Sequence, residues 1–235
     1  MQKLTTNGAL ERYFEVIEEY PQLFEPTPER HGLSLITDRE ALVRAQKELR
    51  RKAESEGVPA HYFTLGILCE DEWYMAIRDL VKFRNGKEGP YIRFVCKKGV
   101  LQGGRNVIVV PYRNDAVLVT RQFRHESRSW VWETPRGFAE PGMDVFSNGR
   151  RELLEETGLT ASKIHLIFHA HEGGASVMLA EVDGDALVQN GDGRESIAEA
   201  RWLTLQELEK WIVDGIITDA ALLAIYIYLQ KMPKL

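Results

Sequence analysis

The strongest constraint on the fold of this chain is the segment from Gly137 to Leu159, which reads GFAEPGMDVFSNGRRELLEETGL. Glu152, Glu155 and Glu156 are spaced so that their side chains lie on one face of a helix. Like charges gathered this closely destabilise a helix unless a cation neutralises them, so a bound divalent metal is the leading interpretation. Ordinary solvated charge is the competing interpretation.

The residues beside this acidic cluster predict where the helix ends. Arg151 precedes the cluster and is able to orient one of its carboxylates. Gly158 follows it, and glycine suits the left-handed turn that ends many helices. The segment therefore predicts a loop, then a helix, then a stop.

The same segment resembles the Nudix box. The family pattern is glycine, five residues, glutamate, seven residues, Arg-Glu, an aliphatic residue, any residue, Glu-Glu, any residue, glycine and an aliphatic residue. The matching positions are Gly137, Arg151, Glu152, Leu153, Glu155, Glu156, Gly158 and Leu159. Met143 stands where the family has its first glutamate. The adjacent Asp144 is not counted as a replacement, because an offset of one residue points a side chain in a different direction.

Three flanking segments resemble the ADP-ribose and nucleotide-sugar pyrophosphatases of this family. They are Arg121–Arg124, Trp132–Gly137 and Gly215–Ala220. The usual family form has leucine where Thr134 stands and alanine where Arg136 stands. The chain thus departs from the pattern near the expected place of the substrate's terminal ribose or sugar. The resemblance therefore constrains the identity of the substrate less than the class of reaction.

Composition excludes several classes of partner. The formal net charge of −5 argues against a general binder of nucleic acids or membrane surfaces. No stretch approaches the ~18 apolar residues of a membrane span, and no signal-peptide pattern is present. Cys69 and Cys96 stand far apart, which suggests thiols in a reducing compartment rather than a disulfide framework or zinc site. We expect a cytoplasmic protein.

The first part of the chain is predicted to be a helical appendage, residues 1–70, ahead of a Nudix domain at residues 71–235. Helices are expected over Leu10–Tyr20 and from the N-cap Asp38 to about Ser55, with Gly57 ending the second. The second helix is interpreted as a solvated layer over its own domain. A partner-binding or dimer element is the alternative.

Short β-rich runs dominate the rest of the chain. Asn85-Gly86 and the Arg113–Asp115 segment mark two hairpin turns. The predicted strands are Trp73–Phe83, Tyr91–Val95, Asn106–Tyr112, Ala116–Phe123, Trp130–Glu133, Ile164–His171, Ser176–Val182 and Glu199–Leu203, and the closing helices are Leu205–Val213 and Asp219–Lys231. This order predicts an α+β fold, and the resemblance likewise implies an α/β/α sandwich of mixed sheets.

The resemblance implies metal-dependent hydrolysis of the pyrophosphate bond in a nucleoside diphosphate linked to another moiety, such as ADP-ribose or a nucleotide sugar. The products would be a nucleoside monophosphate and a sugar phosphate. Mg²⁺ or Mn²⁺, held by hard oxygen ligands, would neutralise the pyrophosphate charge. Glu152 and Glu156 are the first candidate ligands, with Glu155 and the Gly137 carbonyl beside them. Arg151 would hold Glu152 in its ligating orientation.

Further residues are expected to carry catalysis and substrate binding. Glu195, in a loop after the box, is the candidate general base, and Glu199 is the alternative. The candidate substrate-binding residues are Arg121, Arg124, Trp132, Glu133 and Arg136. Arginine guanidinium groups bind phosphate through paired hydrogen bonds, and aromatic rings stack on nucleobases. Structural ion pairs and core packing are the competing interpretations of these side chains.

The sequence also fits a second function from a different class. Met143 and the unusual residues before the box also suit a Nudix-like sensor or scaffold that binds a nucleotide with little or no turnover. A nucleotide small molecule is the expected partner in either case. The resemblance to nucleotide-sugar pyrophosphatases also implies a homodimer.

Overall fold

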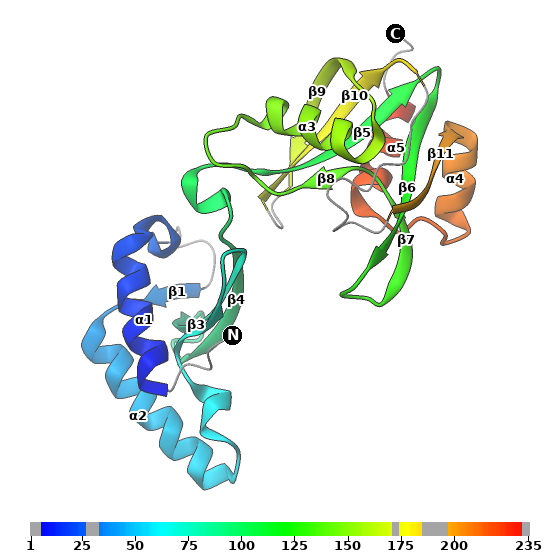
Figure 1. Cartoon of the computed structure of the whole chain (residues 1–235). Coiled ribbons are helices and arrows are strands. Elements are labelled where there is room, and N and C mark those ends of the chain that lie inside the picture. Colours follow the sequence, from blue (N-terminus) through cyan, green and yellow to red (C-terminus); the bar gives the residue numbers. More distant parts are fainter. Residues whose placement is uncertain (1–5, 27–32, 171–173, 185–196, 232–235) are drawn as a thin grey trace. The chain divides into compact units, whose positions relative to one another are not determined.

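The chain forms two compact units, residues 1–101 and residues 102–235 (Figure 1). The computed structural model describes residues 6–26, 33–170, 174–184 and 197–231. The division falls well after the expected boundary at residue 70. The reason is strand pairing, because the strands up to Cys96 join a sheet of the N-terminal unit.

The N-terminal unit packs helices on an antiparallel sheet. Its elements are α1 (Thr6–Glu19), η1 (Pro21–Phe24), β1 (Leu33–Ile36), α2 (Arg39–Glu56), η3 (Ala60–Phe63), β2 (Gly66–Glu70), β3 (Tyr74–Phe83), β4 (Glu88–Cys96) and η4 (Val100–Gln102). Strand β3 is central and pairs antiparallel with β1, β2 and β4. The predicted hairpin around Asn85-Gly86 is confirmed, with Gly86 at a φ of 80°.

Local signals set the ends of α2 as predicted. The Asp38 side chain accepts a hydrogen bond from the Ala41 N–H at 2.8 Å, which caps the helix N-terminus. Gly57 adopts the left-handed conformation at a φ of 67° and ends it. Helix α1 ends before Pro21, whose ring and missing N–H stop a helix.

A buried polar network ties α1 to the sheet of this unit. The Tyr13 hydroxyl donates to Asp79 Oδ1 at 2.7 Å, and Arg93 Nε donates to Asp79 Oδ2 at 2.7 Å. Arg93 also donates to the Leu23 carbonyl at 2.9 Å. Burial, followed by the Asp79 charge, raises the pKa of Tyr13 above its usual value. The network therefore fixes α1 against β3 and β4.

The C-terminal unit contains a mixed sheet and three helices among its described residues. Its elements are β5 (Asn106–Arg113), β6 (Ala116–Arg124), β7 (Ser129–Glu133), β8 (Arg136–Gly137), α3 (Val145–Thr157), β9 (Ala161–His169), β10 (Ala175–Val182), β11 (Ile197–Thr204), α4 (Leu205–Val213) and α5 (Ala220–Lys231). The strand order is β11-β6-β5-β10-β9, with β7 paired to β6 and β8 paired to β5. Strands β5 and β10 run parallel, and the other pairs are antiparallel.

Alternation along the strands sends apolar side chains to both faces of this sheet. On β6, Val117 and Val119 pack in the core with Leu208 of α4 and Leu222 of α5. The intervening Leu118 packs on the opposite face, in the core that contains Leu153 of α3. The sheet is therefore covered by α3 on one face and by α4 and α5 on the other, which confirms the α/β/α architecture (Figure 1).

The predicted strands are all present, with shifted ends. Strand β9 begins at Ala161, earlier than expected, and its predicted end at His171 lies outside the described residues. Strands β1, β2 and β8 were not predicted, and β8 in particular has only two residues, too few to show any alternation.

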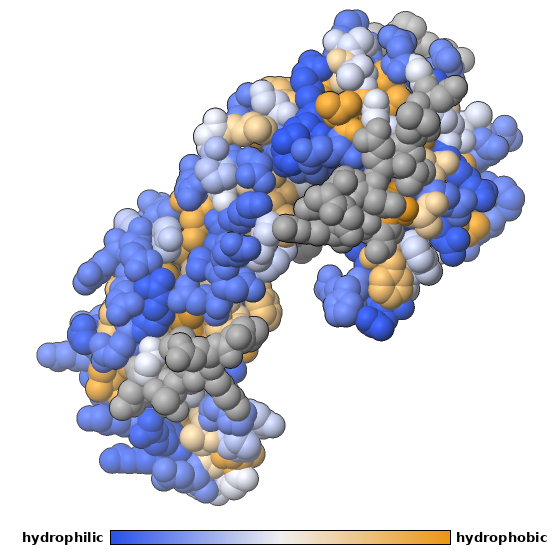
Figure 2. Space-filling view, in the orientation of Figure 1, coloured by the Kyte–Doolittle hydropathy of each residue, from blue (hydrophilic) through white to orange (hydrophobic). Residues whose placement is uncertain are grey.

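The visible surface is mostly hydrophilic, with apolar side chains in separate patches (Figure 2). Phe94 and Val213 are among the exposed large apolar residues. Of the helices that the structure describes, none is long and apolar enough to cross a membrane.

The Tyr13 pKa predicts a pH effect. From about pH 10, the unfolded chain loses the Tyr13 proton that the folded chain keeps, so the free energy of unfolding falls. Tyr13→Phe removes this contribution. The stability difference between wild type and variant should be constant below pH 10 and shrink above it, by up to about 1.4 kcal/mol per pH unit.

Urea unfolding between pH 8 and pH 11 measures this difference. Tyr62→Phe, which removes an exposed hydroxyl of the same unit, is the matched control. A Tyr13→Phe difference that stays constant to pH 11 contradicts the prediction.

Candidate functional site

The helix of the box is α3, and its ends are set by local caps. Asp144 accepts hydrogen bonds from the N–H groups of Phe146 at 2.9 Å and Ser147 at 3.1 Å. Its hydrogen bonds with Ser147 hold the pKa of Asp144 below its usual value. Gly158 adopts the left-handed conformation and ends the helix, as predicted. Asp144 is thus a capping residue, in agreement with its exclusion as a substitute for the missing glutamate.

Two carboxylates of α3 lie buried against strand β8. Glu152 is 6% exposed and Glu156 is 2% exposed. The Arg136 N–H donates to Glu156 Oε1 at 3.1 Å. Gly137 lies so close to Glu152 that a Cβ at this position would overlap its carboxylate. The strand Arg136–Gly137 therefore contacts both of the first-choice metal ligands.

Arg151 connects several acidic and polar groups of the box. Its Nη1 donates to Glu155 Oε2 at 2.7 Å, and its Nη2 pairs with Glu152 Oε1 and donates to Asn148 at 2.9 Å. Glu140, before the helix, approaches Nη2 at 3.8 Å. The expected contact between Arg151 and Glu152 is present, and this pairing fixes the Glu152 rotamer.

Glu155 differs from the two buried carboxylates. Its side chain is 49% exposed and turns toward Arg151. Within the part of the chain that the structure describes, no three His, Cys, Asp or Glu side chains form a metal-binding group. The helix therefore presents a buried pair of carboxylates, Glu152 and Glu156, and a third carboxylate near the surface.

Residues from β6, β7, β8 and the start of α5 form a second charged network. Buried Glu133 pairs with Arg124, whose Nε donates to Glu133 Oε2 at 3.1 Å. Arg136 Nε lies 3.7 Å from the same oxygen, and Arg136 Nη2 pairs with Asp219 at the start of α5. Three predicted substrate-binding residues thus lie in one network of ion pairs, together with Asp219.

The candidate base Glu199 lies between two arginines. Arg121 Nη1 donates to Glu199 Oε1 at 3.3 Å, and Arg201 Nη2 donates to Glu199 Oε2 at 3.1 Å. Desolvation acts to raise the pKa of Glu199, but the hydrogen bonds from the two arginines outweigh it and lower the pKa. A lowered pKa makes this carboxylate a weaker proton acceptor. Glu195, the first-choice base, lies outside the described residues.

The two tryptophans of β7 have different surroundings. Trp132 packs edge-on against Trp211, with ring centroids 5.0 Å apart, and Arg201 covers its face at 5.4 Å. Trp130 is 46% exposed, and the Arg121 guanidinium lies 5.5 Å from its ring centroid. Packing therefore accounts for Trp132, whereas Trp130 and Arg121 together present an exposed aromatic and cationic surface.

Sequence reasoning did not select Asp219 or Glu140 as site residues. Asp219 falls in the Gly215–Ala220 segment noted for its resemblance, which was the available signal. Its contact with Arg136 joins residues 83 positions apart, which no local pattern reveals. Glu140 had no comparable signal, because its approach to Arg151 depends on the loop before α3.

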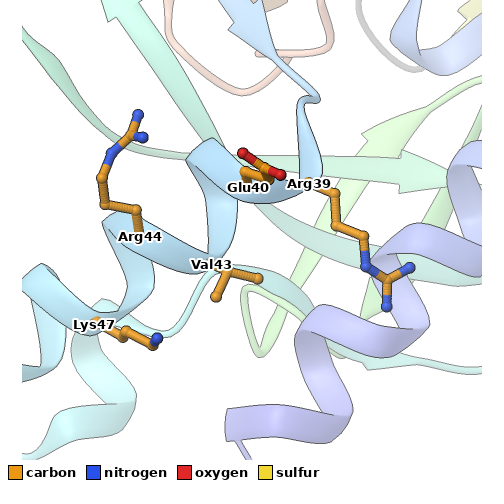
Figure 3. A pocket seen from close by; sticks show the side chains of 5 residues that line it. All are labelled: Arg39, Glu40, Val43, Arg44 and Lys47. Atoms are coloured by element: carbon orange, nitrogen blue, oxygen red, sulfur yellow. The ribbon is translucent and has the colours of Figure 1, made fainter.

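Two surface hollows are lined by other residues. One, of about 410 Å³, is lined by Arg39, Glu40, Val43, Arg44 and Lys47 of α2. Figure 3 shows the Arg39 side chain pointing toward α1 and the Arg44 side chain pointing away from it, so the charges diverge. The other, of about 1170 Å³, includes residues of the turn between β5 and β6, and none of the candidate site residues lines it.

Comparison with known proteins places the chain in a family. A family model described as NUDIX domain matches residues 103–220, within the C-terminal unit. The ADP-ribose pyrophosphatases of Escherichia coli and Shigella flexneri are each 26% identical over 161 residues, covering 61% of this chain and 76% of those proteins. Nudix hydrolase 19, chloroplastic, of Arabidopsis thaliana is 29% identical over 113 residues, covering 44% of this chain and 25% of that protein.

A solved structure has a fold similar to that of this chain. The crystal structure of an ADP compounds hydrolase matches with a TM-score of 0.54 at 18% identity. The match covers 70% of this chain and 89% of that chain. At this identity the likeness shows the fold alone.

The close approach at Gly137 leads to a prediction. Gly137→Ala should displace the Glu152 carboxylate, reduce stability by about 1–3 kcal/mol and weaken Mn²⁺ binding at least about 10-fold. Gly142→Ala is the matched control, because a Cβ at Gly142 would meet no heavy atom within 4 Å and its only cost is the left-handed φ of 74°. Urea unfolding and calorimetry measure the two effects. Equal Mn²⁺ affinity in the two variants contradicts the prediction.

Proposed function

Because this chain belongs to the NUDIX domain family and is a Nudix pyrophosphohydrolase, we propose that its substrate is ADP-ribose or a related nucleotide sugar. The products would be a nucleoside monophosphate and a sugar phosphate. The relatives named as ADP-ribose pyrophosphatases, which align over 76% of their length, support this substrate class. The observation that carries the proposal is the buried pair Glu152 and Glu156 against strand β8.

Nudix hydrolases generally use divalent metals, and the donor chemistry of this site fits one. Glu152 and Glu156 offer hard carboxylate oxygens from adjacent turns of α3, and the absence of a side chain at Gly137 leaves room for the first of them. We propose that these two carboxylates hold Mg²⁺ or Mn²⁺, with Glu155 and the Gly137 carbonyl as further ligands. When bound, the cation would neutralise charge on the pyrophosphate oxygens.

The proposed reaction is attack of water on phosphorus. The water oxygen forms a bond to one phosphorus of the pyrophosphate, and the bond from that phosphorus to the bridging oxygen breaks. The water proton passes to a carboxylate base, and the bridging oxygen leaves with the second phosphate. The ion pairs of Glu199 with Arg121 and Arg201 lower the basicity of Glu199. Glu195 is therefore the proposed base.

The chain's own residues have distinct roles in this proposal. Arg151 orients Glu152 through their ion pair. Arg121 and Arg124 bind substrate phosphates, since their side chains are 42% and 36% exposed and guanidinium forks match phosphate oxygens. Glu133 orients Arg124 through their ion pair, and Trp132 packs against Trp211 beside Arg201. The homodimer, which the family resemblance implies, and the cytoplasmic location remain predictions.

Replacing one metal ligand tests the proposed function. Glu156→Gln should lower the release of nucleoside monophosphate from ADP-ribose more than about 100-fold, because losing a direct ligand costs more than the ~10–100-fold typical of outer residues. Glu209→Gln is the matched control and should cost less than about 2-fold, since it removes the charge of an exposed carboxylate on α4 that has no role in the proposed site. Product mass, with Mg²⁺ or Mn²⁺ present, is the measurement.

Two results would overturn the proposal. One is a wild-type protein that releases no nucleotide product from nucleotide sugars, dinucleotides, nucleoside triphosphates or coenzyme A with either metal. Saturable binding without product in the same samples would identify a nucleotide sensor instead. The other is a Glu156→Gln protein with wild-type turnover.

A further inference from the structure

Strand β8 contacts both buried carboxylates, Glu152 and Glu156. Its Arg136 N–H donates to Glu156, and its Gly137 lies against the Glu152 carboxylate. The strand has only two residues, and its pairing to β5 joins Arg136 to Ile108 and Gly137 to Val107. The Val109 N–H also donates to the Pro135 carbonyl just before the strand, at 2.8 Å. So short a strand has few further backbone hydrogen bonds, which leaves a role for its side chains in holding it in place.

The Arg136 side chain extends from β8 to the start of α5. Its Nη2 pairs with Asp219, and its Nε donates to the Thr134 carbonyl at 3.2 Å. The side chains of Arg136 and Asp219 are 27% and 12% exposed. A partly buried ion pair that also satisfies a backbone carbonyl holds its geometry better than an exposed pair. Figure 1 shows β8 and α5 as parts of the same unit.

Asp219 is itself held firmly. Its Oδ1 accepts from the Leu222 N–H at 2.9 Å, and its carbonyl accepts from the Leu223 N–H at 3.1 Å, so it caps α5. The helix N-terminus also stabilises the negative charge of the carboxylate. Helix α5 is anchored by Leu222 and Ile225, which are fully buried in the core. Asp219 therefore offers Arg136 a fixed point.

We propose that the Arg136–Asp219 ion pair is a positioning device for the metal site. It fixes the Arg136–Gly137 peptide against Glu152 and Glu156, so that Arg136 acts through the backbone of β8 and Asp219 acts through Arg136. Neither side chain touches the pyrophosphate. This assigns Arg136 a different task from the substrate contact expected from the sequence, and the part of the inference that concerns metal and turnover rests on the proposed function.

Amide exchange tests the positioning without metal or substrate. In the full-length protein, Asp219→Asn should speed exchange of the Arg136 amide at least about 10-fold, as followed by mass spectrometry. Asparagine caps helices as well as aspartate does, so the change removes the charge and keeps the cap. Lys210→Ala, which breaks the exposed Lys210–Asp214 pair in the same unit, is the control and should leave this amide unchanged. Unchanged exchange in Asp219→Asn overturns the proposal.

Kinetics separate positioning from substrate binding. Arg136→Ala and Asp219→Asn should each raise the Mn²⁺ concentration for half-maximal rate about 10–100-fold and leave KM for ADP-ribose at saturating Mn²⁺ within about 3-fold of wild type. Arg136→Lys, which keeps a cation opposite Asp219, should recover part of the loss. A raised KM in Arg136→Ala with wild-type behaviour in Asp219→Asn would identify a substrate contact and refute positioning.

A double variant completes the test. If the two residues act as one device, Arg136→Ala with Asp219→Asn should be no worse than the more damaged single variant. Independent, multiplying losses would contradict the proposal. If wild-type protein turns over no substrate, the proposed function fails, and amide exchange at Arg136 still decides the positioning role by itself.

Discussion

The contact between Gly137 and the Glu152 carboxylate is the constraint on which the rest of the candidate site depends. A side chain at position 137 would overlap this carboxylate, so only glycine lets β8 lie directly against α3. The same closeness allows the Arg136 N–H to reach Glu156. Helix α3 also packs closely on the sheet, because a Cβ at Gly149 would lie 2.6 Å from the Cε of Met178 and Leu153 is buried in the same core. The site is thus a product of close backbone packing.

Charge is arranged around this contact in two networks. In the first network, Arg151 forms ion pairs with Glu152 and Glu155 of the same helix. In the second, Glu133 pairs with Arg124 and Arg136, and Arg136 also pairs with Asp219. Acidic side chains packed this densely are stable only where cations and donors compensate them. Arg136 stands where the family usually has alanine. Its charge is compensated by a partner, Asp219, with which it forms an ion pair.

Much of the fold followed from local patterns. The hairpin of β3 and β4, the caps of α2 and the end of α3 at Gly158 were predicted because each depends on residues a few positions apart. Strand β8 was missed, since two residues carry no periodicity and its pairing partner is distant in sequence. The division after residue 101 was missed for a related reason, because β2 to β4 join a sheet with β1 that hydropathy alone does not assign.

The sequence by itself determined the family, the helix of the box and the set of acidic and basic residues proposed for the metal site, because spacing within one helix fixes which side chains share a face. Only the tertiary structure decided which of these residues act together. It buried Glu152 and Glu156 while leaving Glu155 near the surface, paired Glu199 with two arginines, and joined Arg136 to Asp219. Burial and ion pairing depend on groups brought together from distant parts of the chain, and no local pattern encodes that proximity.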